Sequence, residues 1–263
     1  MKNKKLSLFV AVVFVSLVCV SALQASTFTD ASLKGTYAFW DTADVQLNRS
    51  NACAIVGTAT FDGAGHVSLR STQNVGGLIV QKPIISGTYA VSANGTAAMT
   101  FLVTGDTMKF ALALNSIGSN GVAGGFYFTG TGSAGIHTAA ERGFALLTGS
   151  ASFTKASLKG SYAFQIKLQP LSDSDDTEIT GVMTFNGAGS VSVAYTQNKN
   201  GVFLSGSTAG SYSIAANGIG SAIIHPNGSA VNLTIVASAS GKQVYLLGAD
   251  ASGNVELGVA THQ

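Results

Sequence analysis

The feature of this sequence that most constrains its fold is a long internal repeat. Residues 28–39 (FTDASLKGTYAF) recur as residues 153–164 (FTKASLKGSYAF), with ten of the twelve positions identical. Residues 57–74 match residues 181–198 in the same way. The copies lie 124 to 125 residues apart, which is longer than the unit of a solenoid or propeller, so a whole domain has been duplicated. We expect two domains, residues 26–150 and residues 151–263.

Each copy has the pattern of successive β-strands. Apolar side chains alternate with small or polar ones in runs such as residues 37–40, 108–114 and 162–168. A period of two is typical of strands with one buried face. About eight such runs are expected in each copy, and residues 78–91 form one that can break at Pro83.

The turns between the strands indicate how these strands assemble. Asp62-Gly63 and Asn186-Gly187 each separate two alternating runs, which is the strongest short hairpin signal. Short connections favour sequential antiparallel pairing, and an eight-stranded meander removes its edges by closing into a barrel. The predicted fold class is all-β, with two tandem eight-stranded antiparallel meander barrels. A β-sandwich would show the same alternation and is the alternative.

The first 25 residues have the pattern of a signal peptide. Lys2, Lys4 and Lys5 precede an apolar run that ends in small residues, and we expect cleavage near Ala25. An uncleaved anchor helix is the alternative, although the apolar run is short for a membrane span. The predicted location is secreted, periplasmic or in the cell envelope, with no transmembrane helix in the mature chain.

The mature chain is nearly neutral and has one cysteine. Without the leader it carries 11 basic and 12 acidic side chains, a formal net charge of −1. No basic cluster is present, so a nucleic-acid partner is not expected. Cys53 is the single mature cysteine, which excludes an intramolecular disulfide. A buried, unreactive thiol is the interpretation for Cys53, and an intermolecular disulfide is the alternative.

The start of each copy resembles a known family. Residues 33–37 (LKGTY) and 158–162 (LKGSY) are a polar lead-in followed by Gly-x-aromatic at the start of a meander. This resembles the calycin barrels, the lipocalins and avidins, which begin with Gly-x-Trp; Tyr37 and Tyr162 replace the tryptophan. The resemblance implies a cup-shaped barrel that holds a small apolar ligand. The repeat also resembles exported bacterial domains with a Phe-Asx-Gly-x-Gly hairpin, for which no activity follows.

A ligand in such a barrel would contact the aromatic side chains of the inward face. The candidate ligand-binding residues are Tyr37, Phe39, Phe61, Tyr89, Phe101, Phe110, Tyr162, Phe164, Phe185 and Tyr212. Because a small eight-stranded barrel can be filled by its own side chains, a plain aromatic core is the alternative.

Signals for catalysis and cofactors are weak. The chain has no Gly-x-Ser-x-Gly, its four histidines are scattered, and no cofactor is predicted. Residues 130–135 spell Gly-x-Gly-x-x-Gly, but no helix pattern follows, as a dinucleotide site requires. An acidic cluster in the second copy, Asp173, Asp175, Asp176 and Glu178, is a candidate calcium site because calcium prefers oxygen ligands. A solvated loop is the alternative interpretation.

These observations lead to a prediction of a non-enzymatic exported protein of two calycin-like barrels that binds a small hydrophobic molecule. A structural or adhesive surface protein without a ligand is the alternative, and an outer-membrane barrel is a further one. The sequence identifies no protein partner.

Overall fold

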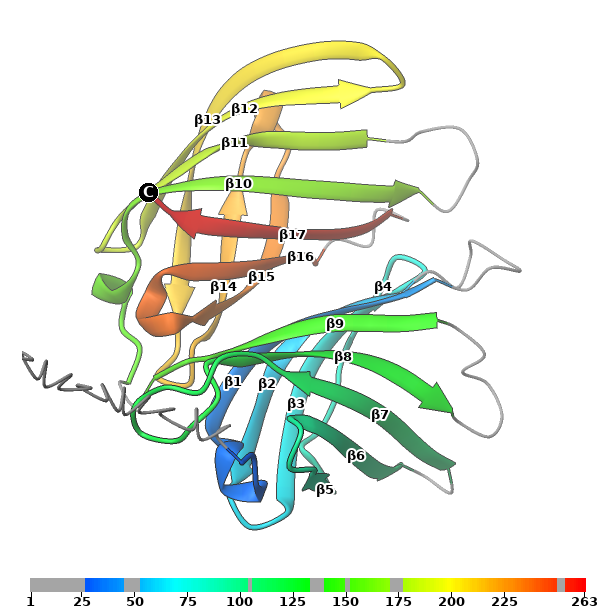
Figure 1. Ribbon diagram of the computed structural model, residues 1–263. Coiled ribbons are helices and arrows are strands. Elements are labelled where there is room, and N and C mark those ends of the chain that lie inside the picture. The colour runs from blue at the N-terminus through cyan, green and yellow to red at the C-terminus, as the bar shows by residue number, and fades with distance from the viewer. Residues whose placement is uncertain are drawn as a thin grey trace, which may run out of the picture.

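Two antiparallel β-barrels follow one another along the chain (Figure 1). The computed structural model describes residues 27–44, 53–103, 106–132, 140–149, 152–170, 177–249 and 254–263. Both sheets close on themselves, so the prediction of barrels is confirmed and the sandwich alternative is not found. The predicted leader and three of the four candidate calcium ligands, Asp173, Asp175 and Asp176, lie outside the described residues.

The first barrel contains eight strands in a closed ring and one additional short strand. The ring consists of β1 (Lys34–Asp44), β2 (Cys53–Asp62), β3 (His66–Val75), β5 (Ile85–Val91), β6 (Thr96–Val103), β7 (Asp106–Leu114), β8 (Gly125–Gly132) and β9 (Ala140–Leu147), and β9 pairs with β1. Strand β4 (Leu78–Gln81) pairs with β3 beside β5. Pro83 separates β4 from β5, as expected for a residue without a backbone donor.

The second barrel has the same strand order without this interruption. Its strands are β10 (Lys159–Pro170), β11 (Thr177–Asn186), β12 (Ser190–Lys199), β13 (Val202–Ile214), β14 (Ile219–Ile224), β15 (Val231–Ser238), β16 (Gln243–Gly248) and β17 (Asn254–His262). Strand β13 is continuous over 13 residues, where the first copy has β4, Pro83 and β5. The duplication in the sequence therefore corresponds to two copies of one topology.

The predicted hairpin turns are present, and both copies close them in the same way. Oδ1 of Asp62 accepts hydrogen bonds from the backbone N–H groups of Ala64 (2.7 Å) and His66 (3.0 Å). Oδ1 of Asn186 accepts the equivalent bonds from Ala188 and Ser190, at 2.7 and 3.0 Å. An acidic residue and an amide thus serve the same turn because only the oxygen acceptor is used.

A short 3₁₀ turn before the first strand covers one end of each barrel, which we call the closed end. The turns are η1 (Asp30–Ser32) and η3 (Lys155–Ser157). The hydroxyl of Tyr89 donates to the carbonyl oxygens of Asp30 (3.0 Å) and Leu33 (2.9 Å). A buried tyrosine in the barrel wall thus fixes the η1 turn.

Other helical segments in the described part of the chain are equally short, η4 (Pro226–Gly228) and η5 (Ala239–Gly241). Across the described residues, no helix combines the length and apolar character needed to cross a bilayer.

The two barrels pack against each other through their outer faces. Buried side chains on β1 and β2 meet buried side chains on β15 to β17 in one apolar cluster: Ala38, Ala54, Val56, Val236, Tyr245, Leu247 and Val255. Nδ2 of Asn74 on β3 donates to the carbonyl oxygen of Gly248 on β16 at 3.1 Å. Apolar residues that alternation places on the outside of each barrel are therefore buried between the two.

Candidate ligand cavity of the first barrel

A cavity of about 380 Å³ lies inside the first barrel. Its walls come from the inward faces of β1, β2, β3, β5, β6, β7 and β8, and most of its lining side chains are apolar. This volume is within the range of small-molecule sites in proteins, about 300 to 1,000 Å³. The cavity is therefore large enough to hold a small organic molecule.

Aromatic rings form much of the cavity wall and contact one another edge to face. The ring of Phe128 lies 6.1 Å from that of Phe39 and 5.8 Å from that of Phe110, with interplanar angles of 76° and 82°. The Phe39 ring lies close to Gly57 on the neighbouring strand, where an added Cβ would approach it to 2.9 Å. Gly57 thus lets the Phe39 ring lie against the neighbouring strand, as Gly181 does for Phe164 in the second barrel.

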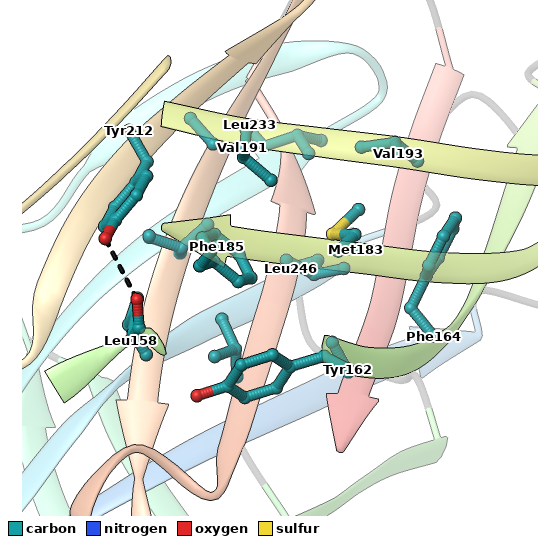
Figure 2. Packing of buried hydrophobic residues seen from close by; sticks show 14 of the residues in the cluster. Leu158, Tyr162, Phe164, Met183, Phe185, Val191, Val193, Tyr212, Leu233 and Leu246 are labelled. Carbon is teal, nitrogen blue, oxygen red and sulfur yellow. Dashed lines mark hydrogen bonds between the residues drawn. The ribbon is translucent and has the colours of Figure 1, made fainter. Parts of the chain in front are cut away.

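The structure separates the predicted ligand-binding residues into three groups. Phe39, Phe101 and Phe110 line the cavity. Tyr37, Phe61 and Tyr89 are buried in the same barrel but do not line it. Tyr162, Phe164, Phe185 and Tyr212 belong to the core of the second barrel, shown in Figure 2.

The tyrosines outside the cavity have structural contacts that explain their burial. The hydroxyl of Tyr37 donates to the carbonyl oxygen of Ala123 at 2.9 Å. In the second barrel, the hydroxyl of Tyr162 donates to Gly241, at 2.6 Å. The hydroxyl of Tyr212 donates to the carbonyl oxygens of Lys155 (2.8 Å) and Leu158 (3.0 Å); the Leu158 bond is drawn in Figure 2. These hydroxyls are occupied by backbone bonds, as expected for buried tyrosines.

Two buried polar residues of the cavity were not among the predicted site residues. Asp41 on β1 and Ser71 on β3 line the cavity, and each side chain is only 3% exposed. Within the part of the chain that the structure describes, neither Oδ1 of Asp41 nor Oγ of Ser71 has a hydrogen-bond partner. Buried polar atoms without partners are uncommon because they lose their bonds to water. Both atoms are therefore available to a ligand in the cavity.

Comparison of the two copies gives the signal that could have identified these residues. Tyr37, Phe39 and Asp41 occupy alternating inward positions on β1, and the third of these corresponds to Ile166 on β10. Ser71 pairs with Gly57, while Tyr195 pairs with Gly181 in the second barrel. The first copy thus has small or polar residues where the second has large ones.

The environment of Asp41 disfavours its charged form. Burial raises the pKa of its carboxyl group well above the ordinary value, and the negative charge of Glu141 on β9 raises it further. The backbone N–H groups of Thr42 and Arg142 act in the opposite direction. Desolvation is the largest of these effects, so the protein favours the neutral carboxyl group more strongly than water does.

Cys53 lies next to this region and matches the expectation for an unreactive thiol. It is half-buried and packs against the core of the first barrel. Burial raises the pKa of its thiol to about 12, and the nearby carboxyl groups of Asp41 and Glu141 contribute in the same direction. The thiolate needed for nucleophilic or redox chemistry is therefore suppressed.

The structure also places some of the acidic residues and histidines that the sequence offered as candidates. Among the described residues, no group of three or more His, Cys, Asp and Glu side chains could hold a metal ion. Of the candidate calcium ligands, Asp173, Asp175 and Asp176 lie outside those residues, whereas Glu178 is exposed on β11, where it pairs with Lys167 on β10 and Asn198 on β12. Nδ1 of His66 lies 2.9 Å from a carboxylate oxygen of Asp62 in the exposed hairpin.

Comparisons with known proteins do not assign the chain to a family. No protein-family model matches it, and no curated protein matches it. One solved structure, described as the crystal structure of CghA with Sch210972, aligns with 86% of this chain and 87% of its own. The two are 8% identical with a TM-score of 0.28. The function must therefore be inferred from the site itself.

Proposed function

We propose that this chain is an exported, non-enzymatic binding protein whose first barrel holds a small apolar ligand. The observation that carries the proposal is the 380 Å³ cavity with a mainly apolar lining and two buried polar atoms that have no hydrogen-bond partner among the described residues. Ligand sites commonly combine an apolar wall with a few polar groups that fix orientation. The leader pattern at residues 1–25 supports export.

The differences between the copies support assigning this role to the first barrel. Ile166 and Tyr195 fill inward positions of the second barrel where the first has Asp41 and Ser71. Ile166 is buried in the core of the second barrel, and Tyr195 packs against that core, as expected for a copy retained for stability. On this proposal, the duplication produced one binding barrel and one supporting barrel.

Native mass spectrometry tests this proposal on protein purified gently from its native host. We expect additional mass that disappears on denaturation, and a denatured mass that corresponds to a chain starting near residue 26. Bare protein, also after incubation with a lipid extract, would contradict ligand binding. A denatured mass that includes residues 1–25 would contradict cleavage of the leader.

Two variants assign the ligand to a barrel by exchanging the matched residues. Ser71→Tyr introduces the large side chain of the second copy into the cavity, and we expect it to abolish the additional mass. Tyr195→Ser makes the reciprocal change in the second barrel and should leave the additional mass in place. Loss of the ligand in Tyr195→Ser alone would instead assign it to the second barrel. Thermal unfolding of both variants verifies that they are folded.

A structural or adhesive role without a ligand is the second candidate, and one feature favours it. Val202, Phe203 and Leu204, at the start of β13, are 60%, 70% and 54% exposed. Three consecutive exposed apolar side chains are characteristic of a contact surface. Replacing all three by threonine would abolish surface adsorption or self-association if this role is correct, and would leave ligand mass unchanged if the binding role is correct.

A further inference from the structure

The carboxyl group of Asp41 is the most unusual group inside the first barrel. It is 3% exposed, it lines the cavity, and its Oδ1 has no hydrogen-bond partner among the described residues. A buried carboxyl group without a full set of partners costs folding free energy. The second copy shows that the fold does not require an acid here, because Ile166 occupies the equivalent position. The acid therefore points to a role in binding.

The charged groups around Asp41 indicate which ligand it would select. Glu141 on β9 is close enough to raise its pKa, and the thiol of Cys53 on β2 is neutral. Lys82, between β4 and β5, also lines the cavity, but its side chain is exposed. The other lining residues are uncharged, and those from β6, β7 and β8 are apolar. Among the described side chains, two acids and one exposed base lie at this part of the barrel, which favours a cation.

From this arrangement we propose that the first barrel binds an amphiphile with one ammonium group, which Asp41 holds inside the cavity while the apolar part contacts the phenylalanine wall. The inference rests on the binding function proposed above and specifies its ligand class. Oγ of Ser71, which also lacks a partner among the described residues, can accept a further hydrogen bond from the ammonium group. An alkylammonium ion thus matches both the apolar wall and the unpaired oxygens.

The proposal also predicts a proton exchange. Burial and the charge of Glu141 raise the pKa of Asp41, which favours a protonated carboxyl group when no cation lies beside it. An ammonium ion next to it favours the carboxylate, so the proton leaves to solvent when the ligand binds. The affinity for an amine should therefore rise with pH until Asp41 is ionised in the free protein or the amine loses its own charge.

The size of the cavity indicates suitable probes. At about 30 Å³ for each water-sized group, 380 Å³ accommodates roughly a dozen non-hydrogen atoms. Decylamine, 1-decanol and decanoate have this size and share a ten-carbon chain, and their head groups are cationic, neutral and anionic. Isothermal titration calorimetry of the mature chain with each probe compares cationic, neutral and anionic heads on one apolar body.

We expect decylamine to bind about tenfold or more tightly than 1-decanol, and decanoate to bind most weakly. Asp41→Asn should remove this preference and leave the 1-decanol affinity within about threefold of the wild type. Asp41→Ile, which introduces the residue of the second copy, should do the same. Asp62→Asn removes an exposed carboxylate in a hairpin and is the control for unspecific attraction of the amine.

Titrations in two buffers of different ionisation enthalpy measure the released proton. Decylamine should release a proton from the wild type and none from Asp41→Asn, and 1-decanol should release none from either. Equal binding of decylamine and 1-decanol by wild type and Asp41→Asn would overturn the ammonium proposal and leave the binding function standing. The ammonium proposal would also fail if decanoate bound most tightly. No binding of any probe would count against the binding function itself.

Discussion

The hydroxyl of Tyr212 donates a hydrogen bond to the carbonyl oxygen of Leu158 at 3.0 Å, and Tyr89 makes the same bond to Leu33 at 2.9 Å. Each bond joins a strand in the barrel wall to the 3₁₀ turn that covers the closed end. The two residues of this contact are 54 residues apart in the second copy and 56 in the first, and both copies make it. It accounts for why these tyrosines are buried away from the cavity.

We expect Tyr212→Phe to destabilise the protein by about 1–3 kcal/mol, because two carbonyl oxygens at the closed end lose their donor. Urea unfolding measures the loss. Tyr127→Phe is the control, since Tyr127 is 61% exposed on the outside of the first barrel and its change should have almost no effect. Equal stability of Tyr212→Phe and wild type would show that these bonds do not hold the turn.

The contact between the barrels gives a second prediction. Asn74→Ala removes the bond to Gly248 and the bond from the backbone N–H of Gly77 to Oδ1 of Asn74, whereas Asn198→Ala removes only the equivalent turn bond from Gly201. Asn74→Ala should therefore lower the free energy of unfolding by about 1 kcal/mol or more beyond the loss in Asn198→Ala, and its unfolding midpoint should be lower. Chemical denaturation followed by circular dichroism compares the two variants. Identical midpoints would mean that the bond between the barrels contributes nothing.

Asp62 in the first hairpin should make the stability of the protein depend on pH, whereas Asn186, its counterpart in the second copy, does not titrate. Hydrogen bonds from the backbone N–H groups of His66 and Ala64 lower the pKa of Asp62 to about 2. Because the folded pKa lies below the unfolded value, the stabilisation is fully present above about pH 4 and is lost as pH falls through about 2. Asp62→Asn should remove this dependence and keep the turn, since Asn186 makes the same bonds.

Thermal unfolding at a series of acidic pH values tests the Asp62 prediction. The slope between about pH 4 and pH 2 should be smaller in Asp62→Asn than in the wild type. Asp62→Ala removes the oxygen that accepts both turn hydrogen bonds, so it should be less stable than Asp62→Asn at every pH tested. A wild type and Asp62→Asn with parallel pH profiles would contradict the predicted role of the carboxylate.

The thiol of Cys53 should react slowly with alkylating reagents in the folded protein. Its pKa of about 12 leaves little thiolate at about pH 8, where an ordinary cysteine is partly ionised. Labelling with iodoacetamide, followed by mass spectrometry, should be slow until denaturant exposes the thiol. Rapid labelling of the native protein would show that the first barrel opens near Cys53.

The sequence by itself determined the duplication, the strands and the turns, because these depend on local patterns. Alternation at Tyr37 and Phe39 fixes which face of β1 is buried, and Asp62-Gly63 and Asn186-Gly187 place hairpins where they are found. Barrel closure followed from the need to remove edge strands. These features require only the chemistry of neighbouring residues.

Only the tertiary structure decided where the space inside the barrels lies and which outer faces meet. Phe61 and Phe101 have the same alternation pattern, yet only Phe101 lines the cavity, because position along the barrel axis is set by register across several strands. Asp41 continues an alternating strand as any polar residue could, and its burial depends on strands that are distant in sequence. Likewise, Val56 and Tyr245 are buried because the second barrel lies against the first.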